Sequence, residues 1–505
     1  KKPPPVNKQI TFRKIQGINI SEFIDEIKDS ALFSHPEQNV SALAAQYHQV
    51  LRELLDKHAP ERTCTIPVRP LQPWFDNSIK PEKQRRRQLE RKWLKSVEIG
   101  HPSAPEHEKE FKMHKNHVNA MIMDFKITHY SNRISECEND QRALFNITKR
   151  SLLHQSSETP LPITDCLQDL ADKFNDFYIQ KIANIRSGFA PNDQQDYNWE
   201  DNTHSLHVEF STFSCLTEDE VKKLVSRSPC KSCPSDPIPT NLLKLCIDEI
   251  VPILTQILNG SLTEGVFPES FKEATITPLL KKAGLDLTLS NYRPVSNLLF
   301  LSKLIERAVA DQLVHHISAN GLHDPLQSAY KQFHSTETAL VKVTNDILCA
   351  LDKNEVVILV LLDLSAAFDT VDHKILLHRL EHTFGIKGVA LDWFESYLVG
   401  RKQRVTIKGV SSETALLESG VPQGSVLGPV LWNVYTYPLS KVMNKNNTSY
   451  HLYADDNQVY MVFKPKVVGA QEMTVATVEK CVDNIRDWMY INRCKFNDTK
   501  TECLV

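Results

Sequence analysis

The longest uninterrupted apolar run in this chain is Val356–Leu362, and every side chain in it is aliphatic. Its length is typical of a β-strand, and the absence of polar alternation indicates a strand that is covered on both faces. Asp363 follows directly, so the strand presents a carboxylate at its end. An ionised carboxylate at such a position needs a partner, and the adjacent residues supply no cation.

Two more carboxylates, Asp455 and Asp456, have apolar residues on both sides. This pattern predicts two short strands that meet at a tight acidic turn. Adjacent carboxylates repel each other and are costly to desolvate, and a divalent metal ion would offset that cost because hard cations prefer oxygen ligands. Taken by itself, the pair is better explained as a solvated surface turn.

Asp363 changes that interpretation, because a buried strand presents one carboxylate and a hairpin 92 residues later presents two. Three carboxylates of this kind can converge on two divalent ions about 3.5–4 Å apart, which is the arrangement used for in-line phosphoryl transfer. One ion would lower the pKa of an attacking hydroxyl, and the other would neutralise a leaving pyrophosphate.

The chain has 505 residues, which is too many for one hydrophobic core and predicts two or three domains. The net charge is −3, so composition alone does not indicate a nucleic-acid partner. No signal peptide or apolar run of membrane-spanning length is visible. Eleven scattered cysteines favour a reducing compartment. We therefore expect a nuclear or cytoplasmic protein with no membrane association.

Residues 1–205 are expected to form a mainly helical, partly basic extension. Within it, residues 79–95 carry eight basic and two acidic side chains, a net charge of +6 over 17 residues. The arginines of this segment include Arg85, Arg86 and Arg87. Such a helix either presents a solvated charged face or makes salt-dependent phosphate contacts, and the sequence supports both equally. Apolar spacing predicts another helix over residues 166–186, and residues 187–204 are expected to be a linker.

Beyond residue 205, helices alternate with short extended segments. Thr217 and Glu220 form the pattern of a capping box. Two apolar helices are expected, over residues 241–250 and from Pro252 to residue 263. Two extended pieces follow, and their ends carry basic residues: Lys281, Lys282 and Arg293. These cations either bind a polyphosphate or are ordinary surface charges.

Several of these segments, in this order and spacing, resemble motifs of reverse transcriptases. Residues 362–373 look like the first catalytic motif, residues 419–429 contain a Pro-Gln-Gly motif, and residues 453–456 look like the second metal motif. Further segments are similar to non-LTR (LINE-type) retrotransposon enzymes, with the greatest similarity to jockey-like and chicken-repeat-like elements: 291–294, 327–330 and 488–501.

This resemblance implies an α+β fold, that of a right-hand polymerase. The fingers would span 206–350 and the palm, a small antiparallel sheet with helices, 351–505, after the extension at 1–205. The implied activity is RNA-directed DNA polymerisation, in which a DNA primer 3′-hydroxyl attacks a dNTP on an RNA template. The implied cofactors are two Mg²⁺ or Mn²⁺ ions per active site, and no oligomeric state is specified.

The resemblance also implies a role for particular residues. Asp363 and Asp455 would bind both metal ions, with Asp456 assisting and the Leu364 carbonyl as a backbone ligand. Phe368 would clash with a 2′-hydroxyl and so select deoxynucleotides, although core packing is compatible with its position. Gln423 would lie against the incoming nucleotide and the template. Arg293, together with Lys281 and Lys282, would hold the triphosphate. Lys500 would lie near the departing pyrophosphate. A basic group after an aromatic helix would track the template backbone: Arg401, Lys402 and Arg404.

The family continues beyond residues 500–502 into a primer-gripping hairpin and a thumb, and it carries an endonuclease upstream. We therefore expect a fragment that lacks these parts, with intact catalytic residues but little or no activity alone. Two other classes fit part of the sequence. One is an RNA-directed RNA polymerase, against which Phe368 and residues 422–424 argue. The other is an inert retroelement remnant or RNA-binding module.

Overall fold

The structure is a computed structural model of the chain that describes residues 7–67, 74–137, 140–148, 159–189, 208–231 and 233–505. The chain divides into two compact units, one comprising Lys1–Phe12 with Arg62–Pro160 and the other comprising Arg13–Glu61 with Leu161–Val505. Most of the expected linker at 187–204 lies outside the described residues.

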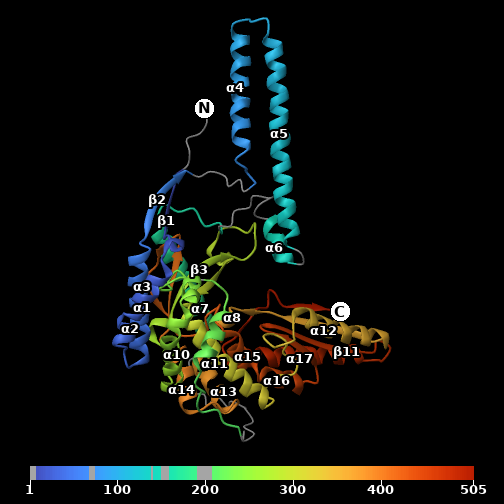
Figure 1. The fold of residues 1–505 in the computed structure, drawn as a ribbon. Helices are drawn as coiled ribbons and strands as arrows, with labels where there is room; N and C mark the ends of the chain where they lie inside the picture. Colours follow the sequence, from blue (N-terminus) through green and yellow to red (C-terminus); the bar gives the residue numbers. More distant parts are fainter. Residues whose placement is uncertain (1–6, 68–73, 138–139, 149–158, 190–207, 232) are drawn as a thin grey trace. The chain divides into compact units, whose positions relative to one another are not determined.

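The first unit contains a two-stranded antiparallel sheet and a helical hairpin. Strands β1 (Asn7–Phe12) and β2 (Arg62–Pro67) pair along their whole length. Helices α4 (Ile79–Glu98) and α5 (Ala104–Ser135) lie side by side, and Trp93 stacks on Phe111 with ring centroids 5.4 Å apart (Figure 1). A short helix, α6 (Gln141–Asn146), follows. The basic helix expected over 79–95 is confirmed.

The second unit is built on one continuous apolar core, to which distant parts of the chain contribute. Phe23 and Leu51, from the first 61 residues, belong to the same core as Trp393. Its helices include α1 (Ile20–Lys28), α2 (Ala31–Ser34), α3 (Val40–His58), α8 (Glu218–Arg227), α11 (Phe300–Ala319), α13 (His373–His382) and α14 (Gly388–Leu398). The division expected at residue 205 is not the boundary between the two compact units, and it remains a prediction about where polymerase fingers begin.

The structure corrects the expected break between two helices near Pro252. Helix α9 (Thr240–Leu245) ends before Cys246, and α10 (Ile247–Glu264) runs through Pro252. Pro252 is tolerated at the sixth position of α10, where it removes one backbone donor but keeps a helical φ. Gly265 ends the helix in the left-handed conformation, as expected. The predicted capping box of Thr217 and Glu220 is also confirmed.

One sheet of the second unit has the order β4-β3-β7-β8. Strand β3 (Glu273–Leu280) pairs antiparallel with β4 (Tyr292–Asn297) and parallel with β7 (Lys402–Ile407), while β8 (Val410–Ser411) and β9 (Ala415–Leu416) pair with β7. Helix α7 (Leu167–Ser187), predicted over 166–186, packs its apolar face on this sheet. Phe174 and Tyr178 are buried there with Ile276.

A second sheet, with the order β10-β11-β5-β13, is antiparallel throughout. It consists of β10 (Ser449–Tyr453), β11 (Asp456–Phe463), β5 (Val356–Leu362) and β13 (Glu502–Leu504). Strand β5 is internal, as predicted, and its two faces pack differently. Ile358, Val360 and Leu362 enter the main core, whereas Val357 and Leu359 pack with α12 (Thr336–Asp352).

The remaining elements complete the surroundings of this second sheet. They are α15 (Gly428–Thr436), α16 (Leu439–Lys445), α17 (Ala470–Ile491), and the short pair β6 (Leu364–Ser365) and β12 (Lys495–Phe496). The predicted α+β class, with an antiparallel sheet, many helices and a helical N-terminal region, is confirmed. Among the helices of the described residues, none has the length and apolarity to cross a membrane.

Candidate active site

Strand register brings the three predicted carboxylates to one end of the β10-β11-β5-β13 sheet. Asn457 on β11 pairs with Leu362 on β5, so the preceding Asp456 lies level with Asp363, which follows Leu362. Asp455 occupies the two-residue turn between β10 and β11. The predicted acidic hairpin and the strand that presents Asp363 are therefore neighbours in space.

The acidic turn is held by a glutamine from another part of the chain. Ala454 has a φ of +58°, a conformation that L-residues seldom adopt. The Gln327 side-chain oxygen accepts hydrogen bonds from the backbone N–H groups of Ala454 (3.1 Å) and Ala329 (2.9 Å). Backbone hydrogen bonds between Leu452 and residues 326 and 328 also fasten this segment to β10. Gln327 thus fixes the turn that carries Asp455.

Burial and neighbouring negative charge oppose the ionisation of Asp455 and Asp456. Burial, and then the charge of Asp363, raise the pKa of Asp455, while Lys500 lowers it. Burial and the charges of Asp455 and Asp363 raise the pKa of Asp456. Asp363 therefore makes the ionisation of both Asp455 and Asp456 less favourable, which is a cost that a bound cation would remove.

Asp363 has two partners near the C-terminal end of the sequence. The Asn497 side-chain amide donates to its Oδ2 at 2.6 Å, and the Asn497 backbone N–H donates to its carbonyl at 3.0 Å. Lys500 Nζ lies 3.5 Å from the same Oδ2. The residues adjacent to Asp363 supply no cation. Lys500, which follows β12, supplies one instead.

Carboxylate oxygens are the ligands that hard divalent cations prefer, so the residue types at this end of the sheet fit such an ion. Within the part of the chain that the structure describes, no group of three or more His, Cys, Asp or Glu side chains is close enough to hold a metal ion. Lys500 instead supplies positive charge at Asp363.

Phe368 lies in the 3-10 helix η5 (Ala367–Asp369), just after the strand end that carries Asp363. Its ring stacks on Trp432 with centroids 5.5 Å apart and an interplanar angle of 30°. Its carbonyl accepts from the Val421 N–H at 2.9 Å. Phe368 is half-buried and packs against the main core.

The Pro-Gln-Gly loop packs closely against two other backbone segments. Gly420 has a φ of +90°, and a side chain there would lie 2.7 Å from the Asp369 carbonyl oxygen. Gly424 has a φ of +115°, and a side chain there would lie 2.8 Å from the Ser296 carbonyl oxygen. Glycine is required at both positions, because each combines a left-handed backbone with a close approach.

Gln423, expected to face nucleotide and template, bonds to Asp369 in this structure. The Gln423 side-chain amide donates to both carboxylate oxygens of Asp369, at 3.3 and 3.2 Å. The backbone carbonyl of Gln423 accepts from the Ser296 backbone N–H at 3.0 Å. Burial raises the pKa of Asp369 to about 6, against smaller lowering effects of Lys181 and Gln423. Asp369 is thus a carboxyl group whose ionisation the surroundings oppose.

The predicted triphosphate cations lie near the ends of β3 and β4. Lys281 follows β3, and its Nζ donates to the Ser290 carbonyl at 2.8 Å. Burial, Lys181 and Lys500 together lower the pKa of Lys281, which places these ammonium groups within electrostatic range of one another. Arg293 on β4 and Lys282 are exposed. Lys281 is therefore influenced by Lys500, the lysine that pairs with Asp363.

The structure corrects the expectation for Arg401. Its side chain is 1% exposed, donates to the Tyr397 carbonyl at 2.9 Å and lies over the rings of Tyr397 and Phe267. A buried guanidinium cannot follow a nucleic-acid backbone along the surface. Lys402 is exposed, and Arg404 pairs with Glu273 at 2.7 Å.

The three predicted arginines of the basic helix α4 differ in their exposure to solvent. Arg85 and Arg87 are exposed and Arg86 is half-buried. These three residues lie in the first compact unit, and their contact with nucleic acid remains a prediction.

Glu306 is a site residue that sequence reasoning missed. It is fully buried on α11, and its carboxylate accepts from the backbone N–H groups of Val426 (2.6 Å) and Leu427 (3.2 Å). It therefore holds the chain just after the Pro-Gln-Gly loop. The sequence could have indicated a buried role for Glu306, because this acidic residue follows the apolar residues Leu304 and Ile305 in the helix. For Gln327 and Asn497, the signal was their place in motif-like segments whose contacts no local pattern reveals.

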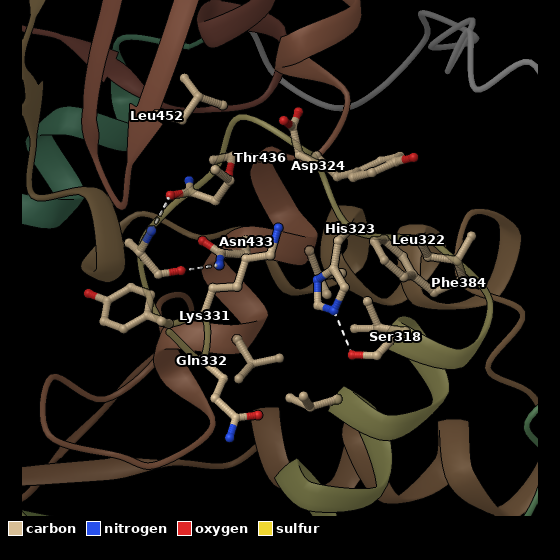
Figure 2. A pocket seen from close by; sticks show the side chains of 18 of the residues that line it. Ser318, Leu322, His323, Asp324, Lys331, Gln332, Phe384, Asn433, Thr436 and Leu452 are labelled. Atoms are coloured by element: carbon tan, nitrogen blue, oxygen red, sulfur yellow. Dashed lines mark hydrogen bonds between the residues drawn. The ribbon is translucent and has the colours of Figure 1, made fainter. Parts of the chain in front are cut away.

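A cavity of about 310 Å³ lies behind the segment that supports the acidic turn. Figure 2 shows its walls, which come from the end of α11, the following loop and α15. His323 bonds to Ser318 at 2.7 Å, and the Asn433 amide donates to the Ala329 carbonyl at 3.1 Å. The cavity is also lined by Gln327, so its shape is tied to the position of the turn.

Comparison with known families identifies the class of this site. Residues 280–505 match the family described as "Reverse transcriptase (RNA-dependent DNA polymerase)". This segment contains all three carboxylates, the Pro-Gln-Gly loop and the Lys500 partner of Asp363. The segment is a reverse transcriptase domain, as its motifs led us to expect.

The curated relatives specify the type of element. The RNA-directed DNA polymerase from mobile element jockey of Drosophila funebris is 34% identical over 222 residues, covering 44% of this chain and 24% of that protein. The corresponding jockey protein of Drosophila melanogaster is 30% identical over 282 residues, covering 54% and 30%. The probable RNA-directed DNA polymerase from transposon BS of Drosophila melanogaster is 32% identical over 222 residues, covering 44% and 24%. This part of the chain is therefore similar to the polymerases of jockey and related mobile elements.

This chain spans less than a third of the length of these relatives. A solved structure, apo telomerase from Candida Tropicalis, aligns with a TM-score of 0.36 and 13% identity, covering 52% of this chain and 55% of that chain.

Proposed function

We propose that this chain is the polymerase portion of an RNA-directed DNA polymerase of a non-LTR retrotransposon. The observation that carries the proposal is the register of β5 and β11, which brings Asp363 beside Asp455 and Asp456 in a domain of the reverse transcriptase family. The substrates would be dNTPs, a DNA primer and an RNA template.

Asp363, Asp455 and Asp456, with the Leu364 carbonyl, would hold two divalent ions, Mg²⁺ or Mn²⁺. When bound, such ions lower the pKa of the primer 3′-hydroxyl and neutralise charge on the pyrophosphate. The mutual repulsion of the three carboxylates supports this role, because positive charge between them would stabilise their ionised forms. Lys500 would release Asp363 and turn to the phosphates, which its exposed position allows.

The protein groups around the carboxylates would position the nucleotide. Lys281 and Arg293 would bind its phosphates, and Phe368 would lie under its sugar and exclude a 2′-hydroxyl. Gln423 would exchange its bonds with Asp369 for contacts to the nucleotide. Catalysis would come mainly from orientation and from charges fixed in place before the reaction.

Single-nucleotide incorporation tests this function. Purified chain in excess over an RNA template with an annealed DNA primer, given Mg²⁺ and the matching dNTP, should extend the primer by one residue. Asp455→Asn should lower the rate by about 10²-fold or more, because it removes charge that the reaction requires. Equal incorporation by both proteins would contradict the assignment of Asp455. No incorporation by the wild type would agree both with the expected low activity of this chain alone and with the inert-remnant alternative.

The same assay distinguishes the RNA polymerase alternative. The wild type should prefer dNTPs over rNTPs, and Phe368→Ala should reduce that preference by removing the ring that meets the 2′-hydroxyl. A wild type that prefers rNTPs would contradict the assignment as a DNA polymerase.

A further inference from the structure

Helix α7 precedes the 280–505 reverse transcriptase segment in sequence but belongs to the same compact unit. Near its middle, Phe174 meets Tyr292 edge to face at 5.0 Å, and the Asn175 side chain bonds to Gln403 and to the Glu413 carbonyl, each at 3.0 Å. At its C-terminal end, Arg186 pairs with Asp372 at 3.1 Å. The helix is therefore held to the domain on both sides of Lys181.

Lys181 borders two cavities. The first, of about 280 Å³, is also lined by Ser296, Asp369 and Gln423. The second, of about 400 Å³, is lined by Ser365 and Lys495, and Ser365 is two residues beyond Asp363. Lys181 is exposed and makes no hydrogen bond or ion pair with any described residue. Its ammonium group is therefore free to meet a molecule that enters either space.

The surroundings of Lys181 favour an anion. Lys181 and Lys500 both act electrostatically on Lys281 from two other parts of the chain. Carboxylates offset part of this positive charge, because Lys500 pairs with Asp363 and Lys181 acts on the half-buried Asp369. The 280 Å³ cavity is also lined by Arg186 and Arg401. Buried nitrogen atoms of these two arginines, Nη1 of Arg186 and Nε and Nη2 of Arg401, have no hydrogen-bond partner among the described residues. Clustered cations of this kind are stabilised by a polyphosphate.

We propose that Lys181 binds the phosphates of the incoming nucleoside triphosphate together with Lys281 and Lys500, so that α7 completes the substrate site. This inference rests on the proposed polymerase function, and it adds a binding residue that lies about 100 residues before the domain match. Lys181 would act as a point charge that tolerates movement of the phosphates during the reaction.

Nucleotide binding without chemistry tests the proposal. Wild type, Lys181→Ala, Lys181→Arg and Lys173→Ala would be titrated with a fluorescent dNTP complementary to the template, on an RNA template with a dideoxy-terminated DNA primer and Mg²⁺. Lys173 is an exposed lysine of the same helix and serves as the matched control. Lys181→Ala should weaken dNTP binding about five- to tenfold, while the Arg variant and the control stay within twofold of wild type.

Primer–template affinity and melting temperature would be measured on the same proteins. Both should be unchanged in Lys181→Ala, because Lys181 makes no structural contact. Unchanged dNTP affinity in Lys181→Ala would overturn the proposal, as would a loss confined to primer–template affinity, which would make Lys181 a nucleic-acid contact. A wild type that does not distinguish the matched from a mismatched dNTP would contradict the polymerase function itself.

Discussion

Asp369 combines a half-buried carboxyl group, a donor from Gln423 and a pKa raised to about 6 by burial. Its ordinary value is 3.8, so the native state holds the proton more tightly than the unfolded state. The resulting contribution to stability is complete below pH 3.8 and is lost as the pH rises through about 6. Above that pH, the ionised Asp369 makes an unfavourable contribution to folding.

Asp369→Asn should therefore increase the free energy of unfolding at pH 7.5 relative to wild type, by on the order of 1–2 kcal/mol after allowance for solvent screening. At pH 4 the two proteins should differ little. Urea denaturation at both pH values measures the difference, with the exposed Asp176→Asn as a control on the surface of α7. If Asp369→Asn lowers the free energy of unfolding at pH 7.5, the native state favours the ionised form of Asp369 and the prediction is wrong.

At this scale the sequence predicted individual carboxylates well but their partners poorly. Asp363 and Asp455 were recognisable because a buried strand and an acidic hairpin are local patterns. The bonds of Asn497 and Lys500 to Asp363 join residues more than 130 positions apart, and no local pattern records them. Arg401 was misplaced because a charged residue after a helix usually faces solvent, whereas here two aromatic rings cover it.

At the scale of elements, the acidic hairpin depends on a segment that is neither strand nor helix. Residues 326–329 run beside β10 and place the Gln327 side chain under the turn. A glutamine is suited to this position because its oxygen accepts from two backbone N–H groups without adding charge beside Asp455 and Asp456.

Gln327→Ala should lower the rate of nucleotide incorporation about tenfold or more with little change in primer–template affinity. The substitution leaves the buried N–H of Ala454 without an acceptor, a cost of about 1–3 kcal/mol that the turn relieves by moving. Single-turnover incorporation measures the rate. The exposed Gln332→Ala, in the following loop, is the matched control. An unaltered rate in Gln327→Ala would show that the turn keeps its geometry without this bond.

Element boundaries were predictable where the chain carries a strong local signal. The capping box at Thr217, the strand β5 and the glycine after α10 are of this kind. The break expected at Pro252 was wrong because proline excludes only one hydrogen bond near a helix start, and the apolar face of α10 is buried along its length. Tertiary packing outweighed the local penalty.

At the scale of the whole molecule, the two compact units pose separate questions. The second contains the candidate active site, and the first contains the net-positive helix α4. Sequence alone left a solvated charged face and a phosphate-binding face equally supported for α4. The exposure of Arg85 and Arg87 is compatible with both.

Replacing Arg85, Arg86 and Arg87 together by alanine should decide between them. If the three contact phosphates, the slope of log affinity for single-stranded RNA against log salt should become shallower by about 2, since each contact contributes about 0.7. A matched change of charge on α5, Lys109, Lys112 and Lys115 to alanine, is the control. Equal slopes in the α4 variant and wild type would indicate a solvated face.

The contribution of residues 13–61 to the main core was not predictable from the sequence. Phe23 and Leu51 pack with residues hundreds of positions later, and their helices carry ordinary amphipathic patterns that do not specify a partner. A helical pattern identifies an apolar face, but the surface that covers it is determined by the complete fold.

The match to the reverse transcriptase family begins at residue 280, the last residue of β3. Anyone who designs an expression clone from that boundary would remove β3, the strand that joins β4 to β7, and with it α7. The apolar face of β4 and β7 would then be open to water, and Lys181 would be lost from the cavities that it lines with Gln423 and Ser365. A clone that starts at or before residue 13 keeps residues 13–61, α7 and β3, and so preserves both the buried face and Lys181.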